Sequence, residues 1–352
     1  MPESFAKPDT LLSGPAVWRG DELVDSDEWI HAWTPEELAE LEDALVAVQA
    51  LQRPLGKIGR DDFPLPRLGD RLDRLRADLL RGRGFVLMRG LDASKYSRDE
   101  IATIFWGIGA HLGRAVPQNA QGHLLGHVKD LGRDSRDASA RIYQTSERQG
   151  YHTDSADIVG LLCLEPSMEG GRSSLVSCPT IHNVLFERSP DLLAELFQPF
   201  GTDHRGEHPA DTNPYFTAPI LSWHEDELSV LYQRRYIESA QRFEAVPRLT
   251  GRQVEALDAF DAVADDPAVH LEMRLERGDI QFIHNHQMLH DRTAFRDWPE
   301  PDRRRHLLRL WLCPEDGRPL PPWFAERLGS VEPGDRGGVA LAGVEPVIPP
   351  FP

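Results

Sequence analysis

The sequence predicts a mainly β protein with helical additions, in which helices come first and a β-sandwich or barrel with helical insertions follows. Apolar residues recur at helical spacing through most of residues 1–111, whereas short apolar or alternating runs between Gly, Pro, Asn and Asp dominate after residue 120. The last segment, 314–352, holds nine of the 28 prolines and is not expected to form regular structure.

Three helices and one strand are expected in the N-terminal part. Residues 34–37 form a capping box with proline at the first helical position, and apolar residues follow at helical spacing up to Leu51. A second helix is expected over 70–82, ahead of a short buried strand at 85–91. A further capping box opens a helix over about 97–111.

Short strands separated by turn residues characterise the rest of the chain, and helical patterns interrupt them at 180–197 and 251–264. The candidate strands are 123–128, 141–146, 150–154, 158–164, 173–178, 228–235, 271–275, 279–283 and 305–312. We therefore expect an N-terminal helical segment over 1–82, packed on a core over 83–313. The tail over 314–352 is expected to lie along the barrel surface or to be partly loose.

Composition disfavours some classes of partner. The chain has 352 residues and a net charge of −18, and a strongly acidic surface repels phosphate backbones, so neither nucleic acid nor an anionic membrane is an expected partner. Cys163, Cys178 and Cys313 lack metal-binding spacing and are expected to be reduced core residues. No signal-peptide pattern and no window of about 18 apolar residues occurs, so a cytoplasmic location is expected.

A histidine and an aspartate two residues apart, His152 and Asp154, precede an almost unbroken apolar run. Because residues i and i+2 of a strand point to the same face, they can present an imidazole and a carboxylate to one metal ion, while Thr153 faces the other way. The H-x-D pattern alone has little specificity, and a surface histidine near an acid is the simpler alternative.

A third ligand is expected from residues 277–295, which contain His284, His286 and His290. Two histidines and one carboxylate form the facial triad of non-haem Fe(II) oxygenases, which leaves coordination positions open. Zinc with a bound water is the alternative metal for the same ligands.

Two arginines, Arg305 and Arg309, lie an even number of residues apart in the candidate strand 305–312, so both side chains can point into a barrel. A guanidinium there can bind a carboxylate through two parallel hydrogen bonds. Arg303 and Arg304 are instead expected to belong to a surface cluster.

Four motifs follow one another along the chain: H-T-D at 152–154, G-G-x-S at 170–173, N-x-x-x-x-H at 285–290 and R-x-x-x-R at 305–309. Together they resemble the taurine dioxygenase-like (TauD/TfdA) family of 2-oxoglutarate/Fe(II)-dependent dioxygenases, over about two thirds of the chain. The resemblance implies a double-stranded β-helix (jelly-roll) core with iron near one mouth.

The resemblance also implies that His152, Asp154 and His290 hold Fe(II), with 2-oxoglutarate and O2 as cosubstrates. The distal histidine of the family follows an asparagine by five residues, which selects His290 after Asn285. The other two histidines of this segment are then neighbours of the site and not ligands.

The cosubstrate pocket is implied in the same way. Arg305 matches the arginine that meets the C5 carboxylate of 2-oxoglutarate, and Ser173 matches an assisting hydroxyl. Arg305 follows His290 by 15 residues, an interval that leaves Arg309 as the alternative anchor. Halogenating relatives replace the carboxylate ligand with a small residue, so the retained Asp154 implies hydroxylation or another oxidation, with release of succinate and CO2.

The substrate is expected to be a small polar molecule, anionic or amino-acid-like. Its candidate contacts are Gln118, Asn119, Tyr143 and Arg309, with a turn or core role as the alternative for each. Two other interpretations stay open, a zinc-dependent hydrolase or isomerase on a cupin-like barrel and a non-enzymatic jelly-roll binding protein with structural histidines. A homo-oligomer is compatible with the sequence.

Overall fold

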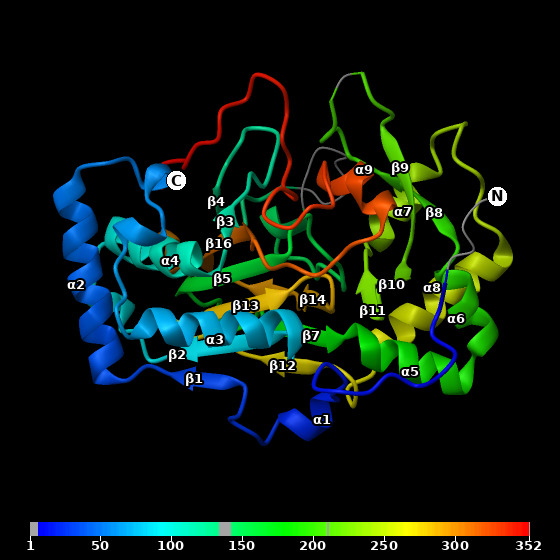
Figure 1. Ribbon diagram of the computed structural model, residues 1–352, viewed down its shortest axis with the longest axis horizontal. Helices are drawn as coiled ribbons and strands as arrows, with labels where there is room; N and C mark the ends of the chain where they lie inside the picture. Colours follow the sequence, from blue (N-terminus) through cyan, green and yellow to red (C-terminus); the bar gives the residue numbers. More distant parts are fainter. Residues whose placement is uncertain (1–5, 134–141, 210, 352) are drawn as a thin grey trace.

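The computed structural model describes residues 6–133, 142–209 and 211–351, with helices grouped on two sides of a central set of strands (Figure 1). The helices are α1 (Gly20–Leu23), α2 (Pro35–Leu51), α3 (Leu68–Arg81), α4 (Arg98–Leu112), α5 (Cys178–Arg188), α6 (Pro190–Leu196), α7 (Arg234–Ala240), α8 (Gly251–Ala264) and α9 (Ala325–Leu328). The strands are β1 (Ile30–Ala32), β2 (Phe85–Arg89), β3 (Arg114–Ala115), β4 (Leu125–Val128), β5 (Ile158–Glu165), β6 (Glu169–Gly170), β7 (Ser173–Ser177), β8 (Pro199–Asp203), β9 (Tyr215–Pro219), β10 (Leu221–His224), β11 (Glu227–Val230), β12 (Leu271–Met273), β13 (Ile280–His284), β14 (Met288–Arg292), β15 (Phe295–Arg296) and β16 (His306–Cys313). None of the helices in the described residues is both long and apolar enough to cross a bilayer.

The largest sheet has the strand order β1-β2-β13-β5-β16-β3, and β4 also pairs with β16. β1 and β2 are parallel, whereas β13 is antiparallel to both β2 and β5, and β5 is antiparallel to β16. Side chains alternate between the two faces of the sheet. In β16, Leu308 and Leu310 belong to the core beneath the helices, whereas Trp311 belongs to the core on the opposite face.

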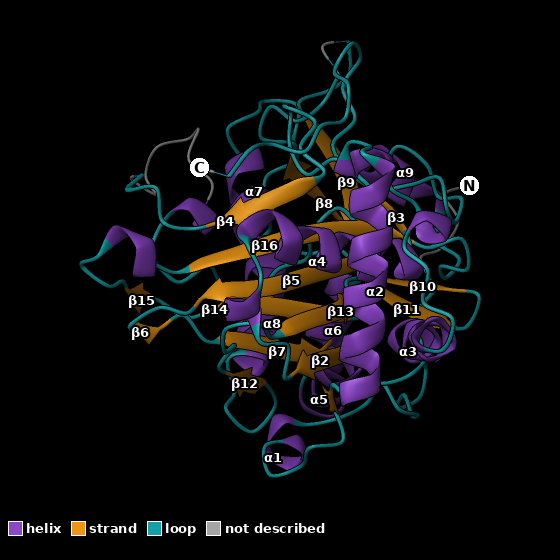
Figure 2. Cartoon of the chain, turned by 90° about the vertical axis from the view of Figure 1, so that its left-hand side faces the viewer, coloured by secondary structure: helices purple, strands orange, loops and turns teal. Residues whose placement is uncertain are grey.

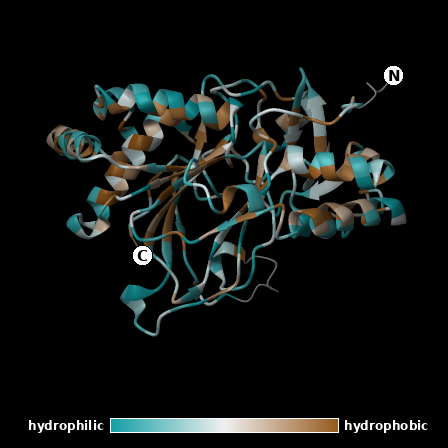
Figure 3. Ribbon diagram, turned by 90° about the horizontal axis from the view of Figure 1, so that it is seen from below, coloured by the Kyte–Doolittle hydropathy of each residue, from teal (hydrophilic) through white to brown (hydrophobic). Residues whose placement is uncertain are grey.

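A smaller antiparallel sheet, β12-β7-β14, packs against the inner face of the large sheet. Leu175 and Leu271 from the small sheet share one core cluster with Leu87, Val159 and Ile283 from the large sheet. Seen from below, the apolar strands lie at the centre of the molecule and the helices carry polar residues on their outer faces (Figure 3). Two facing sheets are the arrangement expected of a jelly-roll core, and the candidate site lies between them.

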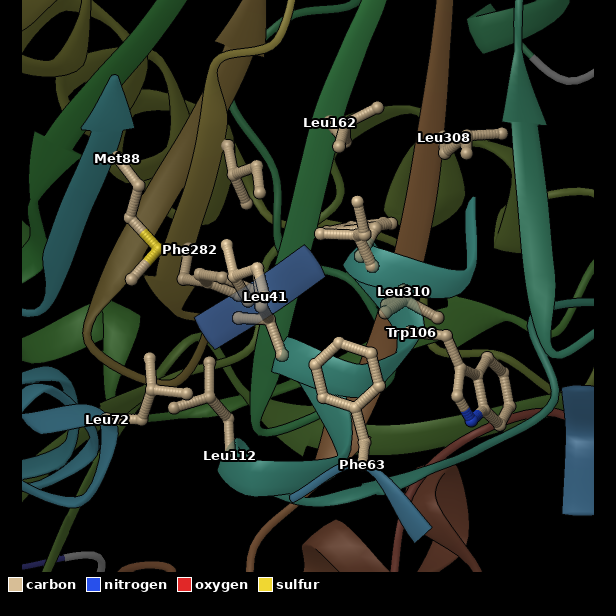
Figure 4. Packing of buried hydrophobic residues seen from close by; sticks show 14 of the residues in the cluster. Leu41, Phe63, Leu72, Met88, Trp106, Leu112, Leu162, Phe282, Leu308 and Leu310 are labelled. Carbon is tan, nitrogen blue, oxygen red and sulfur yellow. The ribbon is translucent and has the colours of Figure 1, made fainter. Parts of the chain in front are cut away.

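A helical layer covers the outer face of the large sheet. α3 and α4 contact its strands, and α2 crosses outside α4 (Figure 2). Phe282, Leu308 and Leu310 from the strands pack against Leu72 and Trp106 from the helices (Figure 4). This core fixes the outward side chains of β13 and β16, so the alternate side chains of these strands must point toward the site.

An insertion between β7 and β12 forms a second cluster of apolar side chains. α5, α6 and α8 pack together there with strands β8 to β11. Phe197 and Phe260 are fully buried in this cluster. The single helical pattern predicted over 180–197 is two helices, because Pro190 follows Ser189 where α5 ends.

The predicted N-terminal helices are confirmed as α2, α3 and α4. Both capping boxes form: Thr34 Oγ1 accepts from the backbone N–H of Glu37 at 3.2 Å, and Ser97 Oγ accepts from that of Glu100 at 3.3 Å. These helices were accessible to prediction because each start signal is local in the sequence.

The predicted strand at 150–154 is wrong. Only an isolated bridge occurs there, at His152, which pairs with Gln233 on one side and His290 on the other. Only His152 is bridged to the neighbouring segments, and the residues around it form no strand. The predicted shared orientation of His152 and Asp154 therefore does not come from strand geometry.

Two further predicted strands are also wrong in part. The first residue of 141–146 lies outside the described residues, and the next three form a 3-10 turn. In 228–235, strand pairing ends at Val230 and α7 begins at Arg234. β8, β9, β10 and β14 were not predicted, because each is too short for an apolar or alternating run to stand out.

The tail over 314–352 departs from its prediction. It contains a 3-10 turn at Pro322–Phe324 and the short helix α9. It also does not lie only along the surface, since the side chains of Arg318 and Arg336 are buried. The division of the chain at residues 82 and 313 stays a prediction, although β1 from the N-terminal segment joins the large sheet.

Candidate metal centre and cosubstrate pocket

Three side chains that are remote in the sequence, His152, Asp154 and His290, converge between the two sheets. One candidate ligand atom from each lies within 4.8 Å of the other two. His152 Nε2 is 3.8 Å from Asp154 Oδ1, and His290 Nε2 is 3.8 Å from Asp154 Oδ2. Two imidazole nitrogens and one carboxylate oxygen fit the facial triad that Fe(II) takes in non-haem oxygenases.

Backbone pairing brings the two histidines together. His290 lies in β14, and the backbone N–H groups of His290 and His152 each donate to the carbonyl of the other at 3.1 Å. Their imidazole centroids are 4.1 Å apart. This reciprocal pair of backbone hydrogen bonds therefore positions His152 beside His290, where a longer strand was predicted.

The ring of His152 is oriented by Gly150 and Gln149. Its Nδ1 lies 2.9 Å from the carbonyl oxygen of Gly150, which can only accept, so Nδ1 carries the proton. Nε2 then carries the lone pair, and the side-chain amide of Gln149 donates to it at 2.9 Å. The nitrogen that faces Asp154 is thus the one able to bind a metal.

Asp154 is held in its charged form. The indole Nε1 of Trp311 donates to its Oδ2 at 2.8 Å, and Arg309 Nη1 donates to the same oxygen at 3.2 Å. Burial alone would raise the pKa of this carboxyl, but Arg309 and the two histidines outweigh burial and lower the pKa to about 2. A charged carboxylate with one oxygen fixed by two donors is a suitable ligand for a cation.

His290 is kept neutral. Burial, followed by the proximity of His152, lowers the pKa of His290 to about 3, so the imidazole is uncharged at pH 7 as metal ligation requires. Its Nδ1 is buried and has no hydrogen-bond partner among the described residues. The donor set and its charge states therefore fit Fe(II).

Asn285 fixes the backbone of the segment that carries Asp154. Its Oδ1 accepts from the backbone N–H of Asp154 at 2.8 Å. Its Nδ2 donates to the carbonyls of Asp154 and Ala156 at 2.6 and 2.8 Å. The side-chain amide thus positions the carboxylate ligand from behind.

The other two histidines of this segment lie apart from the triad. His286 Nε2 is 3.3 Å from Asp157 Oδ1, and His284 Nδ1 faces Arg318 at 3.5 Å. Both imidazoles are buried. This geometry supports His290 as the distal ligand.

A cavity beside His290 is lined by the residues predicted to bind 2-oxoglutarate, namely Ser173, Arg305 and Arg309. The guanidinium of Arg305 is buried, and within the described residues it forms no ion pair or hydrogen bond with another side chain. Burial lowers the pKa of Arg305 to about 10, which leaves it cationic at pH 7. A buried cation without a counter-ion is costly, and the C5 carboxylate of 2-oxoglutarate would supply one.

Arg309 has a different environment. Its Nε donates to Gln118 Oε1 at 2.7 Å, and its charge faces Asp154. Its guanidinium lies 5.0 Å from the ring centroid of Tyr143 and 4.9 Å from that of Trp311. Because these neighbours already engage Arg309, the geometry favours Arg305 as the cosubstrate anchor.

Of the four candidate substrate contacts, Gln118, Tyr143 and Arg309 line a cavity next to the candidate metal ligands, and Asn119 does not. Tyr143 lines the cavity beside His290 and also a second cavity next to Asp154. Gln118 lines the second cavity, but its amide is bonded to Arg309 and to the carbonyl of Leu124. Asn119 lines neither cavity and closes a turn by accepting from the backbone N–H of Gln121 at 3.0 Å.

Sequence reasoning missed four residues at the site: Gln149, Asn285 as a positioning group, Arg292 and Trp311. Arg292 lines the cavity beside His290, and its guanidinium donates to the carbonyl of Thr145 at 3.0 Å. Trp311 was accessible to prediction, because it lies two residues after Arg309 on the same strand face. Asn285 belongs to the N-x-x-x-x-H motif, although the motif does not indicate its positioning role, whereas Gln149 and Arg292 gave no local signal.

Comparison with known proteins identifies the family. The sequence pattern described as "Taurine catabolism dioxygenase TauD, TfdA family" matches residues 50–311, most of the chain. The chain belongs to the TauD/TfdA family. It is therefore a 2-oxoglutarate/Fe(II)-dependent dioxygenase, as the four motifs predicted, and the zinc hydrolase and the non-enzymatic binding protein are set aside.

Individual relatives agree with this assignment. FR-33289 synthase of Streptomyces rubellomurinus is 31% identical over 329 residues, which cover 91% of this chain and 95% of that protein. A taurine hydroxylase-like protein of Stachybotrys chartarum is 29% identical over 85% of this chain and 79% of its own. The structure of an asparagine oxygenase in complex with Fe(II), 2S,3S-3-hydroxyasparagine and succinate superposes with a TM-score of 0.64 at 17% identity, covering 81% of this chain and 93% of that chain. That likeness confirms the predicted jelly-roll fold.

Proposed function

We propose that this TauD/TfdA dioxygenase hydroxylates a C–H bond of a small polar molecule at Fe(II) held by His152, Asp154 and His290, with 2-oxoglutarate anchored by Arg305. The observation that carries the proposal is the pairing of a metal-binding triad with a buried, uncompensated guanidinium in an adjoining cavity. Neither feature has a purpose in the fold alone, since each concentrates charge that a packed core would avoid.

Bound Fe(II), 2-oxoglutarate and O2 supply the oxidising chemistry, and succinate and CO2 are released. The residues of the chain bind and orient these groups. Gly150 fixes the ring of His152, and Trp311 and Arg309 fix one oxygen of Asp154. Ser173, whose Oγ donates to Gln281 at 2.9 Å, lies in the wall of the cosubstrate cavity and can turn toward the C5 carboxylate.

The hydroxylation outcome and the small polar substrate are inferred from two lines of support. Asp154 keeps the carboxylate ligand that hydroxylating enzymes of the family use. The names of similar proteins refer to a taurine hydroxylase-like protein and to an asparagine oxygenase that holds 3-hydroxyasparagine. A cytoplasmic location and a homo-oligomer stay predictions.

The test is the conversion of 2-oxoglutarate to succinate by purified enzyme with and without Fe(II). We expect uncoupled turnover to release some succinate in the absence of substrate, so the test can be made before the substrate is known. His290→Ala should abolish this turnover and lose Fe(II), whereas His286→Ala should retain both. Turnover that persists in His290→Ala and disappears in His286→Ala would transfer the ligand role to His286.

A further inference from the structure

A second cavity, of about 130 Å³, lies against the metal-binding residues and is lined by groups from separate parts of the chain. Its lining includes His152 and Asp154. It also includes Arg205 from the loop after β8, Arg235 from α7 and Arg327 from α9. We call these three residues the arginine cluster. A molecule in this cavity would contact the metal site and the arginine cluster at the same time.

This lining carries an excess of positive charge, although the whole chain has a net charge of −18. With Arg309, four arginines line the cavity, against the carboxylates of Asp154 and Glu207. Fe(II) and doubly charged 2-oxoglutarate have equal and opposite charges, so their binding adds no net charge to the two adjoining cavities taken together. The cavity is therefore two positive charges in excess, which matches a dianion.

Arg205 is held in a fixed place. Its φ of 55° lies in the left-handed region, which is uncommon for a residue with a side chain. Its backbone N–H donates at 2.8 Å to the buried Asp203, whose carboxylate also contacts Ser239 and Arg242. The guanidinium lies 5.6 Å from the ring centroid of Tyr236. An uncommon backbone conformation kept by such a network is typical of ligand-binding positions.

Arg235 and Arg327 are not engaged in structural ion pairs. In the part of the chain that the structure describes, neither has a carboxylate at ion-pairing distance. Arg234, the sequence neighbour of Arg235, differs, because it pairs with three carboxylates within 3.1 Å. The two unpaired guanidinium groups are therefore available to an anion.

We propose that the arginine cluster binds a phosphoryl group, as a phosphate monoester or a phosphonate, on the substrate that is oxidised at the metal site. This inference rests on the proposed function, since it names the class of molecule that the same site oxidises. Guanidinium groups bind oxyanions through paired hydrogen bonds, and three of them match the three terminal oxygens of a phosphoryl group. A carboxylate or a sulfonate carries one charge and would leave half of the excess uncompensated.

The test uses the anaerobic enzyme with Fe(II) and 2-oxoglutarate bound, and three probes with the same methyl group: methylphosphonate, methanesulfonate and acetate. Calorimetric titration is expected to show that methylphosphonate binds most tightly. Arg205→Gln, Arg235→Gln and Arg327→Gln should each weaken its binding about tenfold or more, as the loss of a charge-assisted hydrogen bond predicts. Arg235 is exposed, so its variant should fold even where Arg205→Gln does not.

The matched control is Arg252→Gln, which removes the same charge from an exposed pair between Arg252 in α8 and Asp191 in α6, and should leave methylphosphonate binding unchanged. Tighter binding of methanesulfonate or acetate, or an equal loss in Arg252→Gln, would overturn the phosphoryl site. Loss confined to Arg305→Gln would also overturn it, because the probe would then occupy the cosubstrate pocket. Fe(II)-dependent succinate formation by the unaltered enzyme tests the proposed function separately from the phosphoryl site. If succinate forms but methylphosphonate does not bind, the proposed function stands and the phosphoryl site is wrong.

Discussion

Arg336, from the C-terminal tail, forms a fully buried ion pair with Asp157, three residues after the candidate ligand Asp154. Its Nε donates to Asp157 Oδ1 at 3.0 Å, and its Nη2 contacts the same oxygen. Burial alone would raise the pKa of Asp157, but His286 and Arg336 outweigh it and the pKa is lowered. The backbone of Gly338, two residues on, donates to Ser155 at 2.6 Å. The tail thus anchors the segment that carries the candidate ligand Asp154.

Arg336→Met should lower the free energy of unfolding by about 3–5 kcal/mol, because it leaves the buried carboxylate of Asp157 without its arginine partner. Urea unfolding followed by circular dichroism measures the change. Arg296→Met removes an exposed arginine paired with Glu169 and should cost at most about 1 kcal/mol. Equal losses in the two variants would show that the buried pair does not hold the tail.

Asn285→Ala should weaken Fe(II) binding by about 10- to 100-fold, as expected when a residue that orients a ligand is removed. The fold should survive, and the loss should appear in anaerobic Fe(II) titration. Asn183→Ala is the matched control. The side-chain amide of Asn183 accepts from the backbone N–H of Leu12 and donates to its carbonyl, both at 2.8 Å, away from the candidate site. Unchanged Fe(II) affinity in Asn285→Ala would contradict the positioning role.

Arg305→Ala should raise the KM for 2-oxoglutarate about 100-fold, because it removes a charge-assisted pair in a buried site. Succinate formation at varied 2-oxoglutarate concentration gives this value. Arg304→Ala, one residue earlier and exposed, should leave the KM within about twofold. A larger effect of Arg309→Ala on this KM would make Arg309 the anchor.

His306 is buried and His127 half-buried, and the two rings are paired, with His127 Nδ1 2.9 Å from His306 Nε2. Burial, followed by Lys129 and His123, lowers the pKa of His127 from 6.5 to about 4. Burial, followed by His127 and Lys129, lowers the pKa of His306 from 6.5 to about 3. Above pH 6.5 both folded and unfolded chains are neutral here. Below it the unfolded chain takes up protons that the folded chain does not, so stability falls as the pH drops from 6.5 toward 4.

Each of these histidines should then lower the free energy of unfolding by about 2 kcal/mol between pH 7 and pH 5. Urea unfolding at pH 7 and pH 5 measures the difference in the unaltered protein and in the double variant His127→Gln/His306→Gln. The double variant should lose less stability between the two pH values. An identical loss would assign the acid sensitivity to other groups.

Local signals made part of the fold predictable. The capping boxes at Thr34 and Ser97 lie within four residues of the helices that they begin, and the apolar runs of β5 and β16 are long enough to stand out. β14 and α7 were missed because their sequences lack alternation or a cap, and tertiary pairing decides them. The strand predicted over 150–154 from a short run between turn residues is wrong, and only His152 forms a bridge there.

The candidate site divides in the same way. His152, Asp154, His290, Arg305 and Ser173 followed from motif spacing and resemblance. Their supporting partners depend on distant chain segments, which a single sequence cannot bring together. Arg336 shows this most clearly, since a proline- and glycine-rich tail gave no reason to expect a buried charge beside the metal site.

The most direct test is anomalous diffraction at the iron edge from crystals prepared anaerobically with Fe(II) and 2-oxoglutarate. The expected result is one iron peak bonded to His152, Asp154 and His290, with the C5 carboxylate of 2-oxoglutarate on Arg305. An iron peak at His284, His286 and Asp157, or 2-oxoglutarate away from Arg305, would contradict the account.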